Sequence, residues 1–248
     1  MNRNRLAENG DLFASFWLGR AAEYLKAGDL FAHLLELKND RQLVTDYEEK
    51  VLYVAEWETK KFSSIWEFRS FRILLYCLVR DMGPRNVVET GVMHGMTSGF
   101  ILHALDRNGM GRLNSFDLPS INPSQPSNLD GYLGGLPEGK ECGWIVPDRL
   151  REYWQLHLGR SMDLLPDSGL REVDIFIHDS EHTYDTMWKE LTFAWCILNS
   201  GGVLVCDNIE ANPSFFDFCR RVNRVPLVLP ASNIDTIYAP RFAVIRKD

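Results

Sequence analysis

The sequence lacks several features that would place it in a specialised class. Its 248 residues include five cysteines, an odd number, and no Cys-x-x-Cys pair, so we expect neither zinc-finger spacing nor a disulfide framework. The longest apolar run has seven residues, Ile73 to Val79, whereas a membrane-spanning helix needs about 20. Basic residues are the minority, and the net charge is −7, which argues against nucleic acid as a main partner. We therefore expect a cytoplasmic protein that binds neither membranes nor nucleic acid.

The composition is that of a globular protein, with 45% hydrophobic and 25% charged residues. The N-terminal part shows helical periodicity without strand alternation: apolar side chains recur on one helical face from Phe13 to Leu25, before Gly28. A second helix is predicted from about Ser63 to Asp81, and it ends before Gly83-Pro84. We expect a helical extension over residues 1–62 in front of a domain over residues 63–248, with the extension as a candidate surface for homo-oligomer formation.

The pattern changes after Pro84, where short apolar runs alternate with helical stretches. Helices are predicted at 97–105 and at about 184–198, the latter closed by Ser200-Gly201-Gly202. The predicted strands are 86–89, 113–117, 154–158, 173–177 and 203–206, with 226–229 and 242–245 as two more at one edge. This alternation predicts an α/β fold, a Rossmann-like doubly wound sheet of about seven strands with helices on both faces.

One long irregular segment, Pro119 to Pro147, interrupts the alternation and is rich in Ser, Pro and Gly. A loop of this length in a compact domain is usually functional, often a lid. The alternative is a surface insertion without a role.

The carboxyl ends of the predicted strands gather polar and acidic residues. In open α/β sheets ligands bind outside these ends. The five ends carry Glu89-Thr90-Gly91, Asp117, Gly159-Arg160-Ser161, His178-Asp179 and Asp207-Asn208. Carboxylates that converge in one cleft repel one another unless a cation compensates them. A sulfonium cofactor and a divalent metal ion are the two cations that fit.

The first turn has the pattern Glu89-x-Gly91-x-x-x-Gly95. Glycines at these positions let the backbone turn tightly and approach a ligand. The pattern matches neither the dinucleotide fingerprint Gly-x-Gly-x-x-Gly nor a P-loop. Asp117 closes the next strand, 28 residues after Glu89, at the place where a carboxylate binds a ribose diol.

Taken in order, these motifs resemble a known family. Val-Val-Glu89-Thr90-Gly91-Val-x-x-Gly95 followed by Asp117 is similar to the class I S-adenosylmethionine-dependent methyltransferases. More narrowly, Ile-His178-Asp179-Ser-Glu-His182-Thr-Tyr184 and Gly-Gly-Val-Leu-Val-Cys-Asp207-Asn208 resemble the metal-dependent small-molecule O-methyltransferases related to the catechol and macrolide-sugar enzymes. The resemblance extends from about Trp66 to the C-terminus.

The resemblance implies a role for each matching residue. The cofactor turn is formed by Glu89, Thr90, Gly91 and Gly95, with Thr97 at the methionine carboxylate, Asp117 at the ribose hydroxyls and Ser161 near the adenine. Asp179 lies beside the methionine amine and also binds Mg²⁺ or a similar divalent cation, together with Asp207 and Asn208. His182 takes the proton of the acceptor hydroxyl, and with Asp179 it makes up the catalytic pair. The resemblance also implies that the acceptor hydroxyl belongs to a small molecule or a sugar.

The chemistry of these residues agrees with such a site. Two aspartates and an asparagine offer hard oxygen ligands, which suit Mg²⁺ or Mn²⁺ better than zinc. An imidazole, with a usual pKa of about 6.5, can accept a hydroxyl proton at neutral pH. The alternatives are that Asp179 and Asp207 serve the cofactor without a metal, and that His182 only bonds Glu181 or Tyr184 at a helix start.

Three other functions compete with this interpretation. The first is a class I methyltransferase without metal and with a different acceptor. The second is a non-catalytic protein that binds the cofactor; the presence of all the acids together with His182 argues against it. The third is a nicotinamide-dependent oxidoreductase, which the missing Gly-x-Gly-x-x-Gly and the lack of a Tyr-x-x-x-Lys pair argue against.

Overall fold

The computed structural model describes residues 17–43, 45–47, 50, 70–118, 136–230 and 241–248. Its centre is a seven-stranded sheet with the order β3-β2-β1-β4-β5-β7-β6, in which β7 alone runs antiparallel to its neighbours. The strands are β1 (Asn86–Thr90), β2 (Arg112–Asp117), β3 (Trp154–Leu158), β4 (Val173–His178), β5 (Leu198–Cys206), β6 (Leu227–Pro230) and β7 (Arg241–Arg246). The predicted Rossmann-like fold is confirmed.

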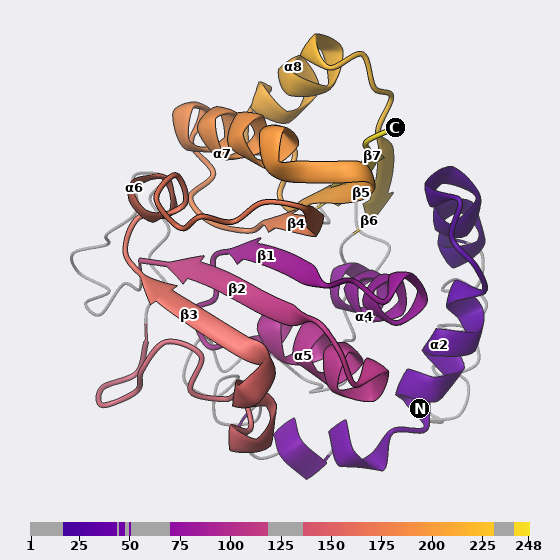
Figure 1. Ribbon diagram of the computed structural model, residues 1–248, viewed down its shortest axis with the longest axis vertical. Coiled ribbons are helices and arrows are strands. Elements are labelled where there is room, and N and C mark those ends of the chain that lie inside the picture. Colours follow the sequence, from indigo (N-terminus) through magenta and orange to yellow (C-terminus); the bar gives the residue numbers. More distant parts are fainter. Residues whose placement is uncertain (1–16, 44, 48–49, 51–69, 119–135, 231–240) are drawn as a thin grey trace, which may run out of the picture.

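Helices cover both faces of this sheet (Figure 1). On one face lie α4 (Ser70–Met82) and α5 (Met96–Asn108), and on the other α7 (Tyr184–Ile197) and α8 (Ser214–Arg221). Successive residues of a strand point to opposite faces of the sheet, so the strands contribute to two separate cores. Val87 and Ile175 pack with α4 and α5, whereas Val88 and Phe176 pack with α7 and α8. A 3₁₀ helix, η1 (Asp148–Tyr153), precedes β3, and the one-turn helix α6 (Ser161–Leu164) follows it.

The prediction for the end of α7 was wrong in one respect. The glycines expected to close this helix, Gly201 and Gly202, lie inside β5. Their backbone reaches the chain beyond β7, since Lys247 N–H donates to the carbonyl oxygen of Gly202 at 2.9 Å. The register between β4 and β5 shifts between Val173, which pairs with Leu198, and Ile175, which pairs with Val203, so β5 holds extra residues at this point.

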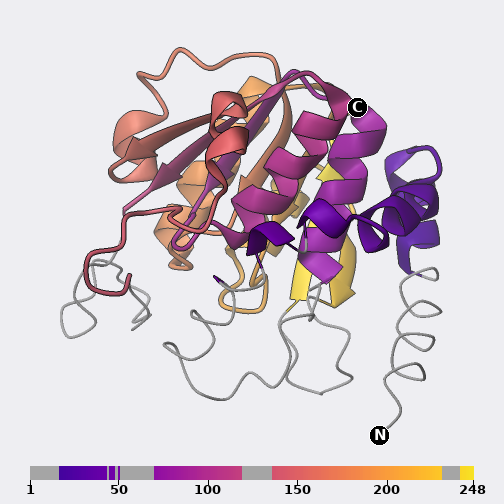
Figure 2. The same cartoon turned by 90° about the horizontal axis from the view of Figure 1, so that it is seen from below.

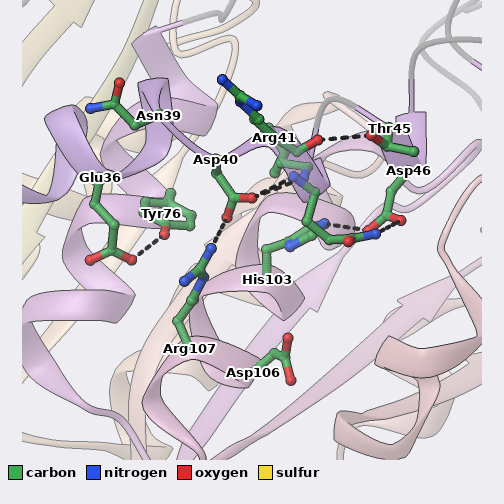
Figure 3. Close-up of polar contacts among 12 residues, drawn as sticks. Glu36, Asn39, Asp40, Arg41, Thr45, Asp46, Tyr76, His103, Asp106 and Arg107 are labelled. Carbon is green, nitrogen blue, oxygen red and sulfur yellow. Dashed lines mark hydrogen bonds and ion pairs between the residues drawn. The ribbon is translucent and has the colours of Figure 1, made fainter.

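The helical N-terminal extension packs against α4 and α5. Residues 17–25 are helical, α2 spans Leu30–Lys38, and residues 41–43 and 45–47 are helical again (Figure 2). Its buried apolar side chains, among them Leu30, Leu34 and Leu37, belong to the same hydrophobic core as those of α4 and α5. Polar contacts add to this packing (Figure 3): Glu36 accepts from Tyr76 Oη at 2.6 Å, and Asp40 pairs with Arg107 at 2.7 Å. The expected boundary at 62/63 and the expected helix start at Ser63 lie outside the described residues.

Two predictions from composition can be compared with the structure. Within the described ranges no helix is long and apolar enough to cross a membrane. Four of the cysteines, Cys77, Cys142, Cys206 and Cys219, are buried as small core residues, and Cys196 is exposed.

Candidate active site

The turn between β1 and α5 needs its glycines because other parts of the chain lie against it. Gly91 has φ +85°, and a Cβ at this position would lie 1.9 Å from the carbonyl oxygen of Asp179. Gly95 has φ +90°, and its Cβ would lie 2.8 Å from Val146 Cγ2. The helix α5 begins directly after Gly95, so its first backbone amides, including that of Thr97, lie at the carboxyl edge of the sheet. Oγ1 of Thr97 accepts from Arg72 Nε at 3.4 Å.

Glu89 lies beneath this turn and is completely buried. Its Oε2 accepts hydrogen bonds from Ser98 Oγ at 2.6 Å and Ser115 Oγ at 2.7 Å. Oε1 has no hydrogen-bond partner. Burial raises the pKa of Glu89 to about 7, against the lowering effect of the two hydroxyl bonds. Glu89 thus supports the turn from inside the protein.

Asp117 ends β2 beside the same turn. Its Oδ2 accepts the Met93 N–H at 3.0 Å and the Cys142 thiol at 2.9 Å. Burial raises the pKa of Asp117, although these hydrogen bonds oppose the rise. The carboxylate predicted to bind a ribose therefore lies at the glycine turn, where the sequence places it.

The end of the long irregular segment is bound to this turn. Gly143 N–H donates to the Met93 carbonyl at 2.8 Å, and Ile145 N–H donates to the His94 carbonyl at 3.2 Å. The indole N–H of Trp144 donates to His94 Nδ1 at 3.0 Å. Residues 143–146 are thus a fixed wall beside the turn, and residues 119–135 of the predicted lid lie outside the described part. Sequence patterns missed His94 and Cys142, because an irregular loop gives no register to predict their contacts.

The ends of β1, β4 and β5 follow one another across the sheet. Asp179 N–H donates to the Thr90 carbonyl and Asp207 N–H to the His178 carbonyl, each at 2.9 Å. Asn208, with φ +48°, turns the chain directly after Asp207, which is 8% exposed. The three residues predicted as metal ligands, Asp179, Asp207 and Asn208, therefore leave adjacent strands at the same edge.

His182 joins this group from the start of α7. Its Nε2 lies 3.4 Å from Asn208 Nδ2, and its carbonyl accepts from Asn212 Nδ2 at 2.8 Å. In the neutral tautomer with the proton on Nδ1, Nε2 accepts this bond from the amide of Asn208. The structure thus brings the predicted base next to one of the predicted metal ligands.

The side-chain oxygens of Asp179, Asp207 and Asn208 are of the type that binds a small hard cation. Two carboxylates and one amide oxygen are ligands that Mg²⁺ accepts, with water at its remaining positions. In the part of the chain that the structure describes, however, no three His, Cys, Asp or Glu side chains are arranged to hold a metal ion. The fit therefore depends on the oxygen of Asn208.

Two predicted cofactor residues turn toward the interior. Thr90 is completely buried, and its hydroxyl donates to Glu190 Oε2 at 2.6 Å. The Ser161 hydroxyl donates to Glu190 Oε1. His178 is also buried, and its Nδ1 bonds Glu190 Oε2 at 2.6 Å. Sequence patterns missed Glu190, although its place among Met187, Leu191 and Ala194 on the buried face of α7 marks an acid at a core position.

A pocket of about 450 Å³ opens beside the start of α7. Its lining includes Arg160, Glu181, Tyr184 and Lys189. Glu181 and Thr183 in its wall flank His182 in the sequence. A hollow therefore adjoins the segment that carries the predicted base.

Residues 88–209 match a family described as a methyltransferase domain. No curated protein matches the chain. Among solved structures, the O-methyltransferase TomG from Streptomyces achromogenes, involved in tomaymycin synthesis and bound to SAM, has TM-score 0.53, 16% identity, and coverage of 85% of this chain and 91% of its own. The O-methyltransferase from Bacillus cereus in complex with SAH has TM-score 0.52, 15% identity, and coverage of 83% and 96%. SAH-bound PaMTH1 from Podospora anserina has TM-score 0.51, 13% identity, and coverage of 85% and 97%. At such identities the similarity to these structures shows a shared fold.

Proposed function

We propose that the chain is a class I S-adenosylmethionine-dependent methyltransferase that methylates a hydroxyl group of a small molecule or sugar with the help of a divalent cation. One observation supports this most: His182, Asn208, Asp207 and Asp179 are grouped at the sheet edge that also carries the glycine turn and Asp117. The solved O-methyltransferases that share the fold add support, since two of them were named for O-methylation and crystallised with SAM or SAH.

The proposed reaction is a direct displacement. The acceptor hydroxyl loses its proton to Nε2 of His182, and its oxygen attacks the methyl carbon of the sulfonium. The oxygen–carbon bond forms while the carbon–sulfur bond breaks, and the electron pair stays on sulfur, giving S-adenosylhomocysteine. Asp117 and the turn at Gly91 hold the cofactor, so that the protein acts by positioning the reactants and by placing negative charge near the sulfonium.

The divalent cation is the finer part of the proposal. Asp179, Asp207 and Asn208 would hold it, and when bound it would lower the pKa of the acceptor hydroxyl. His182 and the cation would then share the removal of one proton. The described residues offer two carboxylates and no third, which favours a methyltransferase without metal as the second candidate.

The first experiment measures SAH binding by calorimetry and transfer of labelled methyl from SAM to a panel of small alcohols, phenols and sugars, with and without a chelator. Wild-type protein should bind SAH, and the chelator should abolish transfer. Asp179→Ala should lose transfer, whereas Asp167→Ala, which removes an exposed acid from a turn, should retain it. Transfer that survives both the chelator and Asp179→Ala would reject the metal and leave the second candidate.

The second experiment tests the base. His182→Gln keeps a group that can accept from Asn208 but cannot take up a proton at neutral pH. We expect kcat to fall by roughly 10²–10⁴-fold, while the SAH dissociation constant stays within a factor of two. A variant that keeps its kcat would assign the proton to another group.

A further inference from the structure

Glu190 is a completely buried acid in the middle of α7. Its Oε2 accepts from Thr90 Oγ1 at 2.6 Å and from His178 Nδ1 at 2.6 Å. Its Oε1 accepts from Ser180 Oγ at 2.8 Å and from Ser161 Oγ. Each carboxylate oxygen therefore accepts two hydrogen bonds, which an ionised carboxylate can do. A protonated acid would have to donate at one of these four contacts.

The electrostatics agree with an ionised group. Burial alone would raise the pKa of Glu190, but the His178 imidazole and the hydrogen bonds from His178, Ser161 and Thr90 outweigh it and lower the pKa. A buried carboxylate that stays charged holds its donors by charge-assisted hydrogen bonds, which are stronger than neutral ones. Its four partners are therefore held tightly in relation to one another.

These partners belong to three different strand ends. Thr90 is the last residue of β1 and precedes Gly91, His178 and Ser180 flank Asp179 after β4, and Ser161 follows β3. The strand ladder already pairs Thr90 with His178. It does not connect either of them to Ser161, because β2 and β1 separate β3 from β4 in the sheet. Glu190 makes that connection and bridges over β2.

We propose that Glu190 is a positioning residue for the cofactor site, which fixes the turn at Gly91, Asp179 and Ser161 in relation to one another without contacting the cofactor. This inference rests on the proposed function, because its effect is exerted on cofactor binding. Loss of the carboxylate should loosen the site while the sheet, which has its own ladder of hydrogen bonds, stays folded.

The chain offers a matched control at the opposite edge of the sheet. Asp174 of β4 accepts from the backbone N–H groups of Arg85 and Asn86 at 2.7 and 3.0 Å, and from Asn199 Nδ2 at 2.8 Å. It too joins the ends of strands, at the amino edge, far from the glycine turn. Asp174→Asn should lower the melting temperature without changing cofactor affinity.

The experiment compares Glu190→Gln, Asp174→Asn and wild type by calorimetry with SAH, by steady-state kinetics with SAM and by thermal unfolding. Glu190→Gln should raise the SAH dissociation constant and the KM for SAM about tenfold or more, with kcat at saturating SAM and the KM for the acceptor changed less than threefold. Asp174→Asn should leave the SAH dissociation constant, both KM values and kcat within twofold of wild type. Equal effects of the two variants on SAH affinity, or none from Glu190→Gln, would overturn the inference.

Two further outcomes are distinguishable. If Glu190→Gln does not fold, Ser180→Ala removes one donor from Oε1 and should still raise the SAH dissociation constant about threefold; an unchanged constant overturns the inference. If wild-type protein does not bind SAH at all, the proposed function fails, and the positioning role fails with it. Wild-type binding together with unaffected variants overturns the positioning role alone.

Discussion

At each of the two edges of the sheet, one carboxylate connects several strands. At the amino edge, the Asp174 carboxylate joins the starts of β1 and β5 to β4 through backbone and amide donors. At the carboxyl edge, Glu190 joins the ends of β1 and β4 to the turn after β3. Both acids connect strands. Four further acids lie at the carboxyl edge: Glu89 and Asp117 in the last two residues of their strands, and Asp179 and Asp207 directly after theirs.

This difference is visible in the pKa values at the carboxyl edge. Burial raises the pKa of both Glu89 and Asp117, and the charge of Asp117 adds to the rise at Glu89. Burial also raises the pKa of the Cys142 thiol, and Asp117 raises it further. Glu190 at the same edge has a lowered pKa because His178 and its hydroxyl donors favour the ionised form. A cation bound beside Glu89 and Asp117 would likewise favour their ionised forms.

The largest effect on the free energy of unfolding should come from replacing a glycine by alanine, and it should differ between the two edges. Gly91→Ala at the carboxyl edge puts a Cβ 1.9 Å from the Asp179 carbonyl at φ +85°, and we expect a loss of roughly 3–5 kcal/mol in the free energy of unfolding. Gly109→Ala, at the amino-edge end of α5, has φ +63° and nothing within 4 Å, so the expected loss is about 1–2 kcal/mol. Denaturant unfolding of both variants checks this; similar losses would mean that the close approach is not rigid.

The second effect concerns pH. Folded Glu89 keeps its proton up to a pKa of about 7, whereas in the unfolded chain it loses the proton near its usual value. Between these two values the folded state binds more protons, so stability falls as pH rises, by roughly 3 kcal/mol in total.

Glu89→Gln removes this titration. Relative to wild type, the variant should gain stability from pH 5 to about pH 7 and level off above it, which denaturant unfolding at several pH values from 5 to 8 would measure. Two curves that stay parallel over this range would show that Glu89 does not carry its proton in the folded state. The comparison of the two edges would then lose its main electrostatic support.

Much of the fold could be predicted because its signals are local. The strand β3 has the predicted bounds Trp154–Leu158, and β1, β2 and β4 differ by one residue at one end. The error at Gly201 and Gly202 came from reading glycines as a helix stop, whereas the chain beyond β7 pairs with them. That pairing joins residues over 40 positions apart, and no local pattern contains it.

The candidate site could be predicted in part for a similar reason. Parallel strands place their last residues at one edge, so Asp117, Asp179 and Asp207 could be located from the strand pattern alone. The direction of the side chains could not be predicted in this way. The hydroxyl of Thr90, for example, turns inward and donates to Glu190, which lies 100 positions away in the sequence. The roles of these residues in binding cofactor or metal stay predictions until the experiments above are done.

The smallest effect should come from the ion pair at the amino-edge end of α5. Arg107 pairs with Asp40 of the N-terminal extension at 2.7 Å, and its side chain is 46% exposed while that of Asp40 is 1% exposed. Asp40 also accepts the N–H groups of Gln42 and Leu43, so it keeps partners when the arginine is removed. Arg107→Gln should therefore lower the free energy of unfolding by about 1 kcal/mol or less, and the difference should shrink in 1 M salt because exposed charges are screened. Melting curves at low and high salt would test this. A loss as large as that of Gly91→Ala would show that the extension is held to the domain mainly by this pair, and the amino edge would then depend on charge as much as the carboxyl edge does.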